Sequence, residues 1–246
     1  MAPYNRDMCV FAMLWRGHPD WMLVAAGNRD ELHARPAEPL SRWEDGSWII
    51  AGRDMLGGGT WLGVSETGRF AVVTNVRGDA APDPAKKSRG GLVTDLLGPG
   101  EIGDVDPDAY NGFNLFAIDE GRGTYLTNRP EAARVALKPG MHGLANGVGT
   151  QAWPKTQAVQ GAVRRWADSG SDDIAPLFDA LRSEQGFVTD QPGSGSPVFI
   201  RDAVYGTRCS TVVLVDAQGR GMIAERSFDA EGAVTGDVRV PFSWMV

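Results

Sequence analysis

The order of the secondary-structure signals predicts an α+β fold with two layers of antiparallel sheet covered by helices. Short apolar runs of strand length occur towards both ends of the 246-residue chain. Turn-forming segments such as Ser65–Gly68 and Asp216–Gly219 separate these runs. The helical patterns cluster in the middle of the chain, and this order differs from the strand–helix alternation that is typical of a parallel sheet.

The predicted strands are short runs rich in apolar, β-branched and aromatic residues. They are Cys9–Trp15, Met22–Ala26, Trp48–Ala51, Thr60–Ser65, Phe70–Thr74, Asn114–Ile118, Thr124–Thr127, Ser210–Asp216, Met222–Ser227 and Val234–Val240. The segment Arg16–Asp20 contains Gly and Pro, so we expect the first two strands to pair as a hairpin. Such a hairpin brings Cys9 beside the end of the second apolar run.

Three helices are predicted in the middle of the chain. Ser88–Leu97 has leucines at a spacing of four residues. Lys155–Ala167 starts directly after Pro154, a residue compatible with the first turn of a helix. Ile174–Arg182 follows two aspartates, whose charge suits the positive end of the helix dipole.

Composition limits the class of protein. The chain has 42% hydrophobic and 22% charged residues, which is ordinary for a globular domain, and its net charge of −7 argues against a nucleic-acid partner. No apolar run approaches the roughly 18 residues of a membrane span, and the N-terminal residues lack the apolar region of a secretory signal. Cys9 and Cys209 form neither a disulfide framework nor a metal-site motif. We therefore expect a cytoplasmic protein with reduced thiols, no bound metal and no membrane span; composition leaves the oligomeric state open.

A polar cluster, Asn28–Glu31, follows the apolar run Trp21–Gly27. Ionised side chains are costly to bury unless they are paired, so such a cluster is either a solvated turn or a built site. The predicted hairpin favours a site, because it places the Cys9 thiol next to Arg29 and Asp30.

Residues Asn28-Arg29-Asp30-Glu31, followed by Leu32–Pro36, resemble the signature of the NRDE family, also called the transport and Golgi organisation 2 family. Further segments agree in order: Gly58–Gly63, Val73–Asn75, Tyr110–Leu115, His142–Asn146 with Trp153–Lys155, and Tyr205–Arg208. The resemblance covers the chain from Met8 onward. It implies a relation to the N-terminal-nucleophile hydrolases and hence a four-layer αββα sandwich, formed by residues 9–246 as one domain.

In N-terminal-nucleophile hydrolases the side chain of the first residue attacks an amide, and its own α-amine is the base. The resemblance to the cysteine-dependent acylases, the bile-salt hydrolases and penicillin V acylases, implies that Cys9 is this nucleophile. Residues 1–8 would block its amine, so the enzymatic interpretation requires that they be absent from the mature protein. Translation from Met8 followed by methionine removal would achieve this.

The other catalytic residues that the resemblance implies are Arg29, Asp30, Asn75, Asn146 and Arg208. Arg29 would favour the thiolate and Asp30 would orient the α-amine. The two asparagines would donate hydrogen bonds to an oxyanion, and Arg208 would complete the charge network.

The spacing of Arg29 and Asp30 departs from the acylase pattern. The acylases space this arginine and aspartate three residues apart, whereas here they are adjacent. Adjacent side chains on a strand point to opposite faces, so both would reach the thiol only if the chain bent after Asn28.

The family resemblance also implies a non-enzymatic role in haem trafficking and, less strongly, the binding of acyl-coenzyme A or a lipid. No Cys-x-x-Cys-His motif is present, so haem would be held non-covalently. The implied ligand contacts are Asn28, Arg29, Glu31, His33, Arg35, His142 and Arg208. The arginines suit propionates and the histidines could supply an axial nitrogen. Ordinary structural roles are the alternative for each of these residues, and equally for Cys9 as a small buried hydrophobic residue.

Because residues 1–8 precede Cys9, the sequence favours haem handling over amide hydrolysis, with acyl-coenzyme A or lipid binding third. Whether the protein is an enzyme stays open at this level. All three interpretations expect Cys9 and Arg29 to share one cavity and to bind a small molecule.

Overall fold

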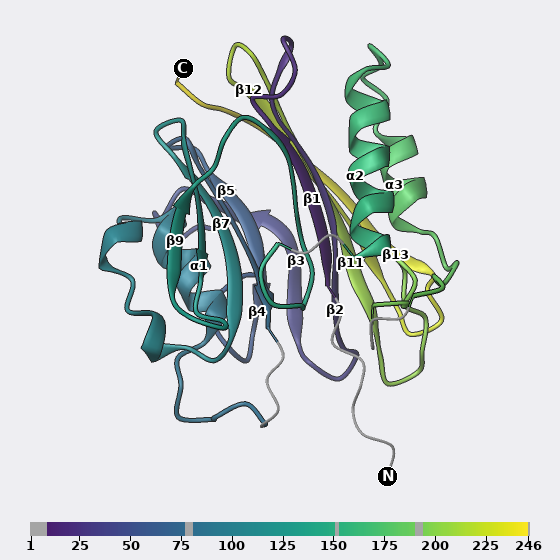
Figure 1. Ribbon diagram of the computed structural model, residues 1–246. Coiled ribbons are helices and arrows are strands. Elements are labelled where there is room, and N and C mark those ends of the chain that lie inside the picture. Colours follow the sequence, from purple (N-terminus) through teal and green to yellow (C-terminus); the bar gives the residue numbers. More distant parts are fainter. Residues whose placement is uncertain (1–8, 77–80, 151–152, 190–193, 246) are drawn as a thin grey trace.

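Two antiparallel sheets packed face to face form the centre of the molecule, as the computed structural model in Figure 1 shows. The structure describes residues 9–76, 81–150, 153–189 and 194–245; residues 1–8, the expected extension, lie outside these ranges. The first sheet has the order β10-β1-β2-β11-β12-β13 and the second the order β3-β4-β5-β6-β7-β8-β9.

The strands of the first sheet are β10 (Gly140–Leu144), β1 (Val10–Trp15), β2 (Trp21–Leu32), β11 (Tyr205–Asp216), β12 (Arg220–Phe228) and β13 (Val234–Ser243). Those of the second are β3 (Ala37–Arg42), β4 (Ile49–Asp54), β5 (Leu62–Ser65), β6 (Arg69–Asn75), β7 (Phe113–Asp119), β8 (Arg122–Thr127) and β9 (Ala133–Ala136). In both sheets, neighbouring strands are paired antiparallel.

Helices cover the outer face of each sheet. α2 (Pro154–Ala167) and α3 (Ala175–Leu181) pack on the first sheet, to the right in Figure 1, and α1 (Arg89–Leu97) packs on the second. Two short 3₁₀ turns, Ile102–Asp104 and Pro107–Ala109, lie between α1 and β7. The predicted four-layer αββα sandwich is therefore confirmed. In the described ranges no helix combines the length and apolar content needed to cross a bilayer.

Three apolar clusters hold the layers together. The inner one joins the sheets, with Phe11 of β1 stacked 5.9 Å from Phe70 of β6 and 6.3 Å from Phe116 of β7, measured between ring centroids. The second lies between the first sheet and α2 with α3, and the third between the second sheet and α1. Alternate residues of β1 enter different clusters, because successive side chains of a strand point to opposite faces.

All predicted strands and helices are present, but the sequence missed β3, β9 and β10. These three strands are edges: β10 of the first sheet, and β3 and β9 of the second. Edge strands need little apolar surface, and β9 is exposed at all four positions, so no alternating pattern marks them. β3 also contains Pro39, which is tolerated at an edge and reads as a strand breaker.

The polar cluster lies within a strand and not in a turn. The strand predicted to end at Ala26 continues to Leu32, because β2 is paired with β1 on one side and with β11 on the other. The hairpin of β1 and β2 forms as expected, with Val10 opposite Asn28.

Asn28 ties the sheet to the helix layer. Its side chain is fully buried, and Nδ2 donates to the carbonyl oxygens of Leu181 and Val198, each at 2.8 Å. Its Oδ1 accepts a hydrogen bond from the Ser210 hydroxyl at 2.6 Å. A side chain that can both donate twice and accept is therefore required at this position.

Replacing Asn28 with Asp should destabilise the fold by about 3 kcal/mol, because the isosteric carboxylate loses both donors and faces two carbonyl oxygens in a buried site. The free energy of unfolding from urea denaturation would measure this loss. Gln218→Glu, the same amide-to-carboxylate change at an exposed turn, is the matched control and should change stability by under about 0.5 kcal/mol. Equal effects of the two changes would contradict the assigned role of Asn28.

Candidate active site

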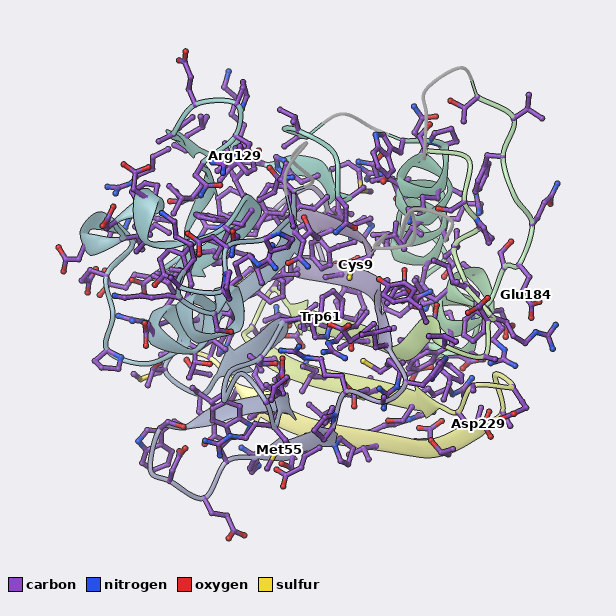
Figure 2. All side chains as sticks on the ribbon, turned by 90° about the horizontal axis from the view of Figure 1, so that it is seen from below. Cys9, Met55, Trp61, Arg129, Glu184 and Asp229 are labelled. Carbon is purple, nitrogen blue, oxygen red and sulfur yellow. The ribbon has the colours of Figure 1, made fainter. Side chains whose placement is uncertain are left out.

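A cavity of about 850 Å³ opens between the two sheets, at the end of the sandwich where β1 begins. Figure 2 views this end, with Cys9 and Trp61 near its centre and Met55 and Asp229 towards its rim. Both sheets and the start of α1 contribute to the lining. Seven residues predicted from the sequence line the cavity: Cys9, Arg29, Asp30, Glu31, Arg35, Asn75 and Arg208.

The strand register sets these side chains in a row across the first sheet. Arg29 lies directly opposite Cys209 of β11, and Cys209 lies opposite Ser227 of β12. Continuing the β1–β2 register by one residue from Val10 and Asn28 puts Cys9 beside Arg29. Directly opposite residues share a face, so this row faces the space between the sheets. Arg29 therefore stands between two thiols.

The Cys9 sulfur is held by the backbone of the neighbouring strand. The amide nitrogen of Asp30 lies 3.4 Å from Sγ, and Sγ lies 3.8 Å from the Asp30 carbonyl oxygen. Burial and, to a smaller extent, the charge of Asp30 raise the pKa of the Cys9 thiol to about 12. The charges of Arg29 and Lys155 act in the opposite direction and lower that pKa. In the chain that carries residues 1–8, the thiol is therefore protonated at neutral pH.

Arg29 is a mostly buried cation whose two ion pairs are long. Its side chain is 12% exposed, and Nη2 lies 3.7 Å from Glu31 Oε2 and 3.9 Å from Asp54 Oδ2. Within the described ranges its guanidinium makes these ion pairs and no closer side-chain hydrogen bond. A guanidinium has five N–H donors, so Arg29 retains capacity to bind an anionic group in the cavity.

Arg208 sits in a β-bulge. The register between β2 and β11 shifts between Thr207 and Cys209, which leaves Arg208 as the extra residue. Its Nη1 donates to the carbonyl oxygens of Leu32 at 2.8 Å, His33 at 3.1 Å and Arg35 at 3.0 Å. Burial and the nearby charge of Arg29 lower the pKa of Arg208. Arg208 thus fixes the turn that follows β2.

The strand stays extended through Arg29 and Asp30, so their side chains face opposite ways. Asp30 Oδ1 accepts a hydrogen bond from Thr207 Oγ1 at 2.6 Å, and Tyr205 donates to the Asp30 carbonyl at 2.8 Å. Asp30 reaches the thiol through its backbone, while Arg29 faces the cavity. Asp30 contacts the Cys9 sulfur and Arg29 lowers the pKa of the thiol, although the chain does not bend after Asn28.

The two asparagines differ in their surroundings. Asn75, the last residue of β6, lines the cavity. Asn146 follows β10, and continuing the β1–β10 register from Phe11 and Leu144 places it across from Cys9. Its side chain is 1% exposed, and neither Nδ2 nor Oδ1 has a hydrogen-bond partner among the described residues. A buried amide without partners is unusual, and Asn146 does not itself line the cavity.

Three other predicted site residues lie outside the cavity lining. The Asn28 side chain donates to the carbonyl oxygens of Leu181 and Val198, on the helix side of the first sheet. His33 Nε2 lies 3.1 Å from the carbonyl oxygen of Asp202, and His142 Nε2 lies 2.8 Å from that of Lys138. The His142 ring also packs against Phe116, with 5.8 Å between ring centroids. Each imidazole is thus engaged with the protein, away from Cys9.

Sequence reasoning missed several charged residues that shape the site. Asp54 accepts two hydrogen bonds from Arg35, at 2.9 and 2.7 Å, and these lower its pKa although burial raises it. Glu225 of β12 is 5% exposed, and burial raises its pKa. Lys155 is fully buried in the first turn of α2. The only signal for Lys155 was the Trp153–Lys155 segment; Asp54 and Glu225 had none.

Comparison with solved structures defines the class of fold. Two structures of conjugated bile acid hydrolase from Clostridium perfringens, a mutant and a variant, superimpose with a TM-score of 0.52 each. The mutant is 8% identical to this chain, and the alignment covers 94% of this chain and 92% of the hydrolase. The variant is 10% identical, and the alignment covers 96% of this chain and 97% of the hydrolase. The fold is that of the N-terminal-nucleophile hydrolases.

Sequence comparison defines the family. The family model "Transport and Golgi organisation 2" matches residues 8–230. The Transport and Golgi organization protein 2 homolog of Homo sapiens is 34% identical over 244 residues, and the Mus musculus homolog is 32% identical over the same length. Each alignment covers 84% of this chain and 87% of the relative. The chain belongs to the transport and Golgi organisation 2 family, as its motifs predicted.

Alkylation of Cys9 in the 246-residue protein should be at least about 100-fold slower at pH 8 than that of a free cysteine, because its pKa of about 12 leaves little thiolate. Asp30→Asn should accelerate the reaction several-fold and Arg29→Gln should slow it, since these charges raise and lower the pKa respectively. Peptide mass spectrometry after iodoacetamide treatment, in a Cys209→Ala background, would give the rates. Free-cysteine reactivity at Cys9 would contradict the buried setting.

Proposed function

We propose that the protein hydrolyses a linear amide, with Cys9 as its N-terminal residue and nucleophile. One observation carries the proposal: the Cys9 thiol shares a cavity with Arg29 and Asn75. Asn146, outside the cavity lining, lies across from Cys9 with both amide atoms buried and without partners among the described residues. The fold class supports it, because the cysteine-dependent hydrolases of this class use the residue at the start of the first strand.

Removal of residues 1–8 is central to the proposal. While Cys9 is acylated by Met8, its nitrogen is an amide and cannot accept a proton. A free α-amine has an ordinary pKa of about 7.7–8.0, so it is a base near neutral pH. It would take the proton of the thiol, and the resulting ammonium would stabilise the thiolate that burial disfavours. The family match begins at residue 8, directly before Cys9, which is in keeping with this processing.

The reaction then proceeds in two halves. The Cys9 thiolate attacks the carbonyl carbon, and the oxyanion accepts hydrogen bonds from Asn146 Nδ2 and from Asn75. The C–N bond breaks as the α-ammonium gives its proton to the leaving amine, which leaves a thioester on Cys9. A water molecule, deprotonated by the α-amine, attacks the thioester. Release of the carboxylic acid restores the thiol.

Three charged residues support these steps. Asp30 borders the sulfur and would orient the α-ammonium, and Arg29 would stabilise the thiolate across the strand pair. Arg208 would position both, because it holds the turn that follows them. The proposal places the protein in the cytoplasm, where the free thiols of Cys9 and Cys209 stay reduced.

Non-covalent binding of haem is the second candidate. The residues of the cavity fit haem in part: Arg29 and Arg208 suit propionate groups, and the volume lies within the usual range for small-molecule sites. The two thiols, and not a histidine, are the soft donors in the lining. Because His33 and His142 lie outside the lining, haem ranks below amide hydrolysis here. Acyl-coenzyme A or another lipid would use the same arginines and ranks third.

A protein that begins at Cys9 should hydrolyse N-acyl amides, whereas the protein that keeps residues 1–8 should be at least about 100-fold slower for lack of a general base. Amine release from a panel of N-acyl amides would give kcat/KM, and intact mass would define the first residue of each preparation. Asn146→Ala should lower kcat by about 100-fold, the usual effect of losing an oxyanion donor.

Cys9→Ala in the processed protein is the control and should abolish turnover. Hydrolysis that persists in this variant, or in the protein with residues 1–8 attached, would rule out the N-terminal cysteine as nucleophile. A purified protein from its natural source that retains residues 1–8 by mass would also remove the proposal.

Haem titration followed by absorbance tests the second candidate. If the cavity is the site, the Soret band should shift saturably at micromolar haem, and Arg29→Gln should weaken binding about tenfold through loss of a propionate contact. His33→Ala and His142→Ala should leave the titration unchanged, because both rings are engaged outside the cavity. An unsaturable titration eliminates this candidate, and loss of binding in a histidine variant moves the site elsewhere.

A further inference from the structure

The cavity extends well beyond Cys9. Along the first sheet its lining runs from Cys9 at β1, past Arg29 and Cys209, to Gly236 and Val238 of β13. Strands lie about 4.8 Å apart, so these four strand intervals span roughly 19 Å. We call the part beyond Arg29 the distal arm; it is lined by Gly52, Cys209, Glu225, Ser227, Gly236 and Val238. A linear molecule with its reacting carbon at Cys9 has room to lie along it.

Glu225 places a buried carboxylate in the lining of the distal arm. It is 5% exposed and lies three strands from β1, in the order β1-β2-β11-β12. The Leu40 amide of the opposite sheet donates to Oε1 at 2.9 Å, and the Cys209 side chain also hydrogen-bonds the carboxylate. These bonds hold it between the sheets. The nearby Arg29 offsets part of its charge. A buried carboxylate that borders a cavity favours a ligand group that donates a hydrogen bond to it.

The opposite sheet leaves room in front of this carboxylate. Position 52 is glycine; a methyl group there would lie 3.4 Å from Oε2 and 3.8 Å from Oε1 of Glu225, and 3.1 Å from the carbonyl oxygen of Glu38. Any larger side chain would fill the arm at this point. The absence of a side chain therefore keeps Glu225 within reach of a ligand.

We propose that the distal arm binds the amine half of the substrate, and that Glu225 accepts a hydrogen bond from a neutral O–H or N–H group on that half. This inference rests on the proposed amide hydrolysis. A plain acyl chain carries no hydrogen-bond donor for Glu225, whereas the amine half of an amide can carry a hydroxyl or amide group that donates to it. We expect a neutral donor because the charge of Arg29 already offsets part of the charge of this carboxylate. The substrate class is an N-acyl amide whose amine half is long and ends in a hydroxyl or amide group.

Binding and turnover are measured separately. The Cys9→Ala variant of the processed protein is titrated calorimetrically with two amides of one fatty acid, one of a long-chain amino alcohol and the other of the alkylamine of equal length. The hydroxyl amide should bind about 10-fold to 100-fold tighter, which is the usual range for a hydrogen bond to a charged acceptor. Hydrolysis of the same pair is measured with the Cys9 protein.

Two variants locate the preference. In Glu225→Gln the side-chain oxygen can still accept from Leu40, which turns the amide NH₂ towards the arm. The ligand hydroxyl then accepts a neutral hydrogen bond and no longer donates to a charged oxygen, so the preference for the hydroxyl amide should fall by about tenfold. Gly52→Ala should weaken both amides by narrowing the arm. Glu44→Gln, the same change at an exposed position, is the control and should keep the preference.

Equal affinities for the two amides, a preference that Glu225→Gln leaves unchanged, or binding of neither amide would overturn the assignment of the distal arm. Selective binding without hydrolysis by the Cys9 protein would retain the arm as a binding site and remove the proposed reaction. The two failures are therefore distinguishable.

Discussion

The buried position of Arg29 is the constraint on which the site depends. β2 is the only described strand paired with both β1 and β11, and Arg29 lies where this pairing places one thiol on each side of it. A charge in such a position is tolerated when opposite charges lie nearby. Glu31 comes from the same strand, but Asp54 comes from the second sheet. The two sheets must therefore be packed together before Arg29 is compensated, which couples the integrity of the fold to that of the site.

Burial has a second consequence at Cys9. A thiol with a pKa near 12 is a poor nucleophile at neutral pH, so chemistry at this position requires a proton acceptor inside the cavity. The charges of Arg29 and Lys155 favour the thiolate, and the Asp30 side chain faces Thr207. The α-amine of Cys9 itself is the group that would meet this need. In the proposed reaction, the state of the Cys9 nitrogen would therefore decide whether the thiol can react.

Much of the fold could be predicted because buried strands and amphipathic helices carry local patterns. The apolar runs of β1 and β6, and the leucine spacing of α1, were visible in the sequence. Three of the four edge strands, β3, β9 and β10, were not visible, since an exposed edge such as β9 needs no apolar pattern. The length of β2 was also missed: a polar segment such as Asn28–Glu31 normally ends a strand, and here the neighbouring strands β1 and β11 keep it paired.

The sequence by itself determined the hairpin that brings Cys9 to Arg29, the αββα class and the family, because these follow from neighbouring segments and from motifs along the chain. Only the tertiary structure decided which polar residues share the cavity. It placed Glu225 and Asp54 there, left His33 and His142 outside, and used Asn28 to hold the helix layer. The physical reason is that a cavity between two sheets is formed by strands far apart in sequence. Their register, including the bulge at Arg208, is fixed only when the sheets pack.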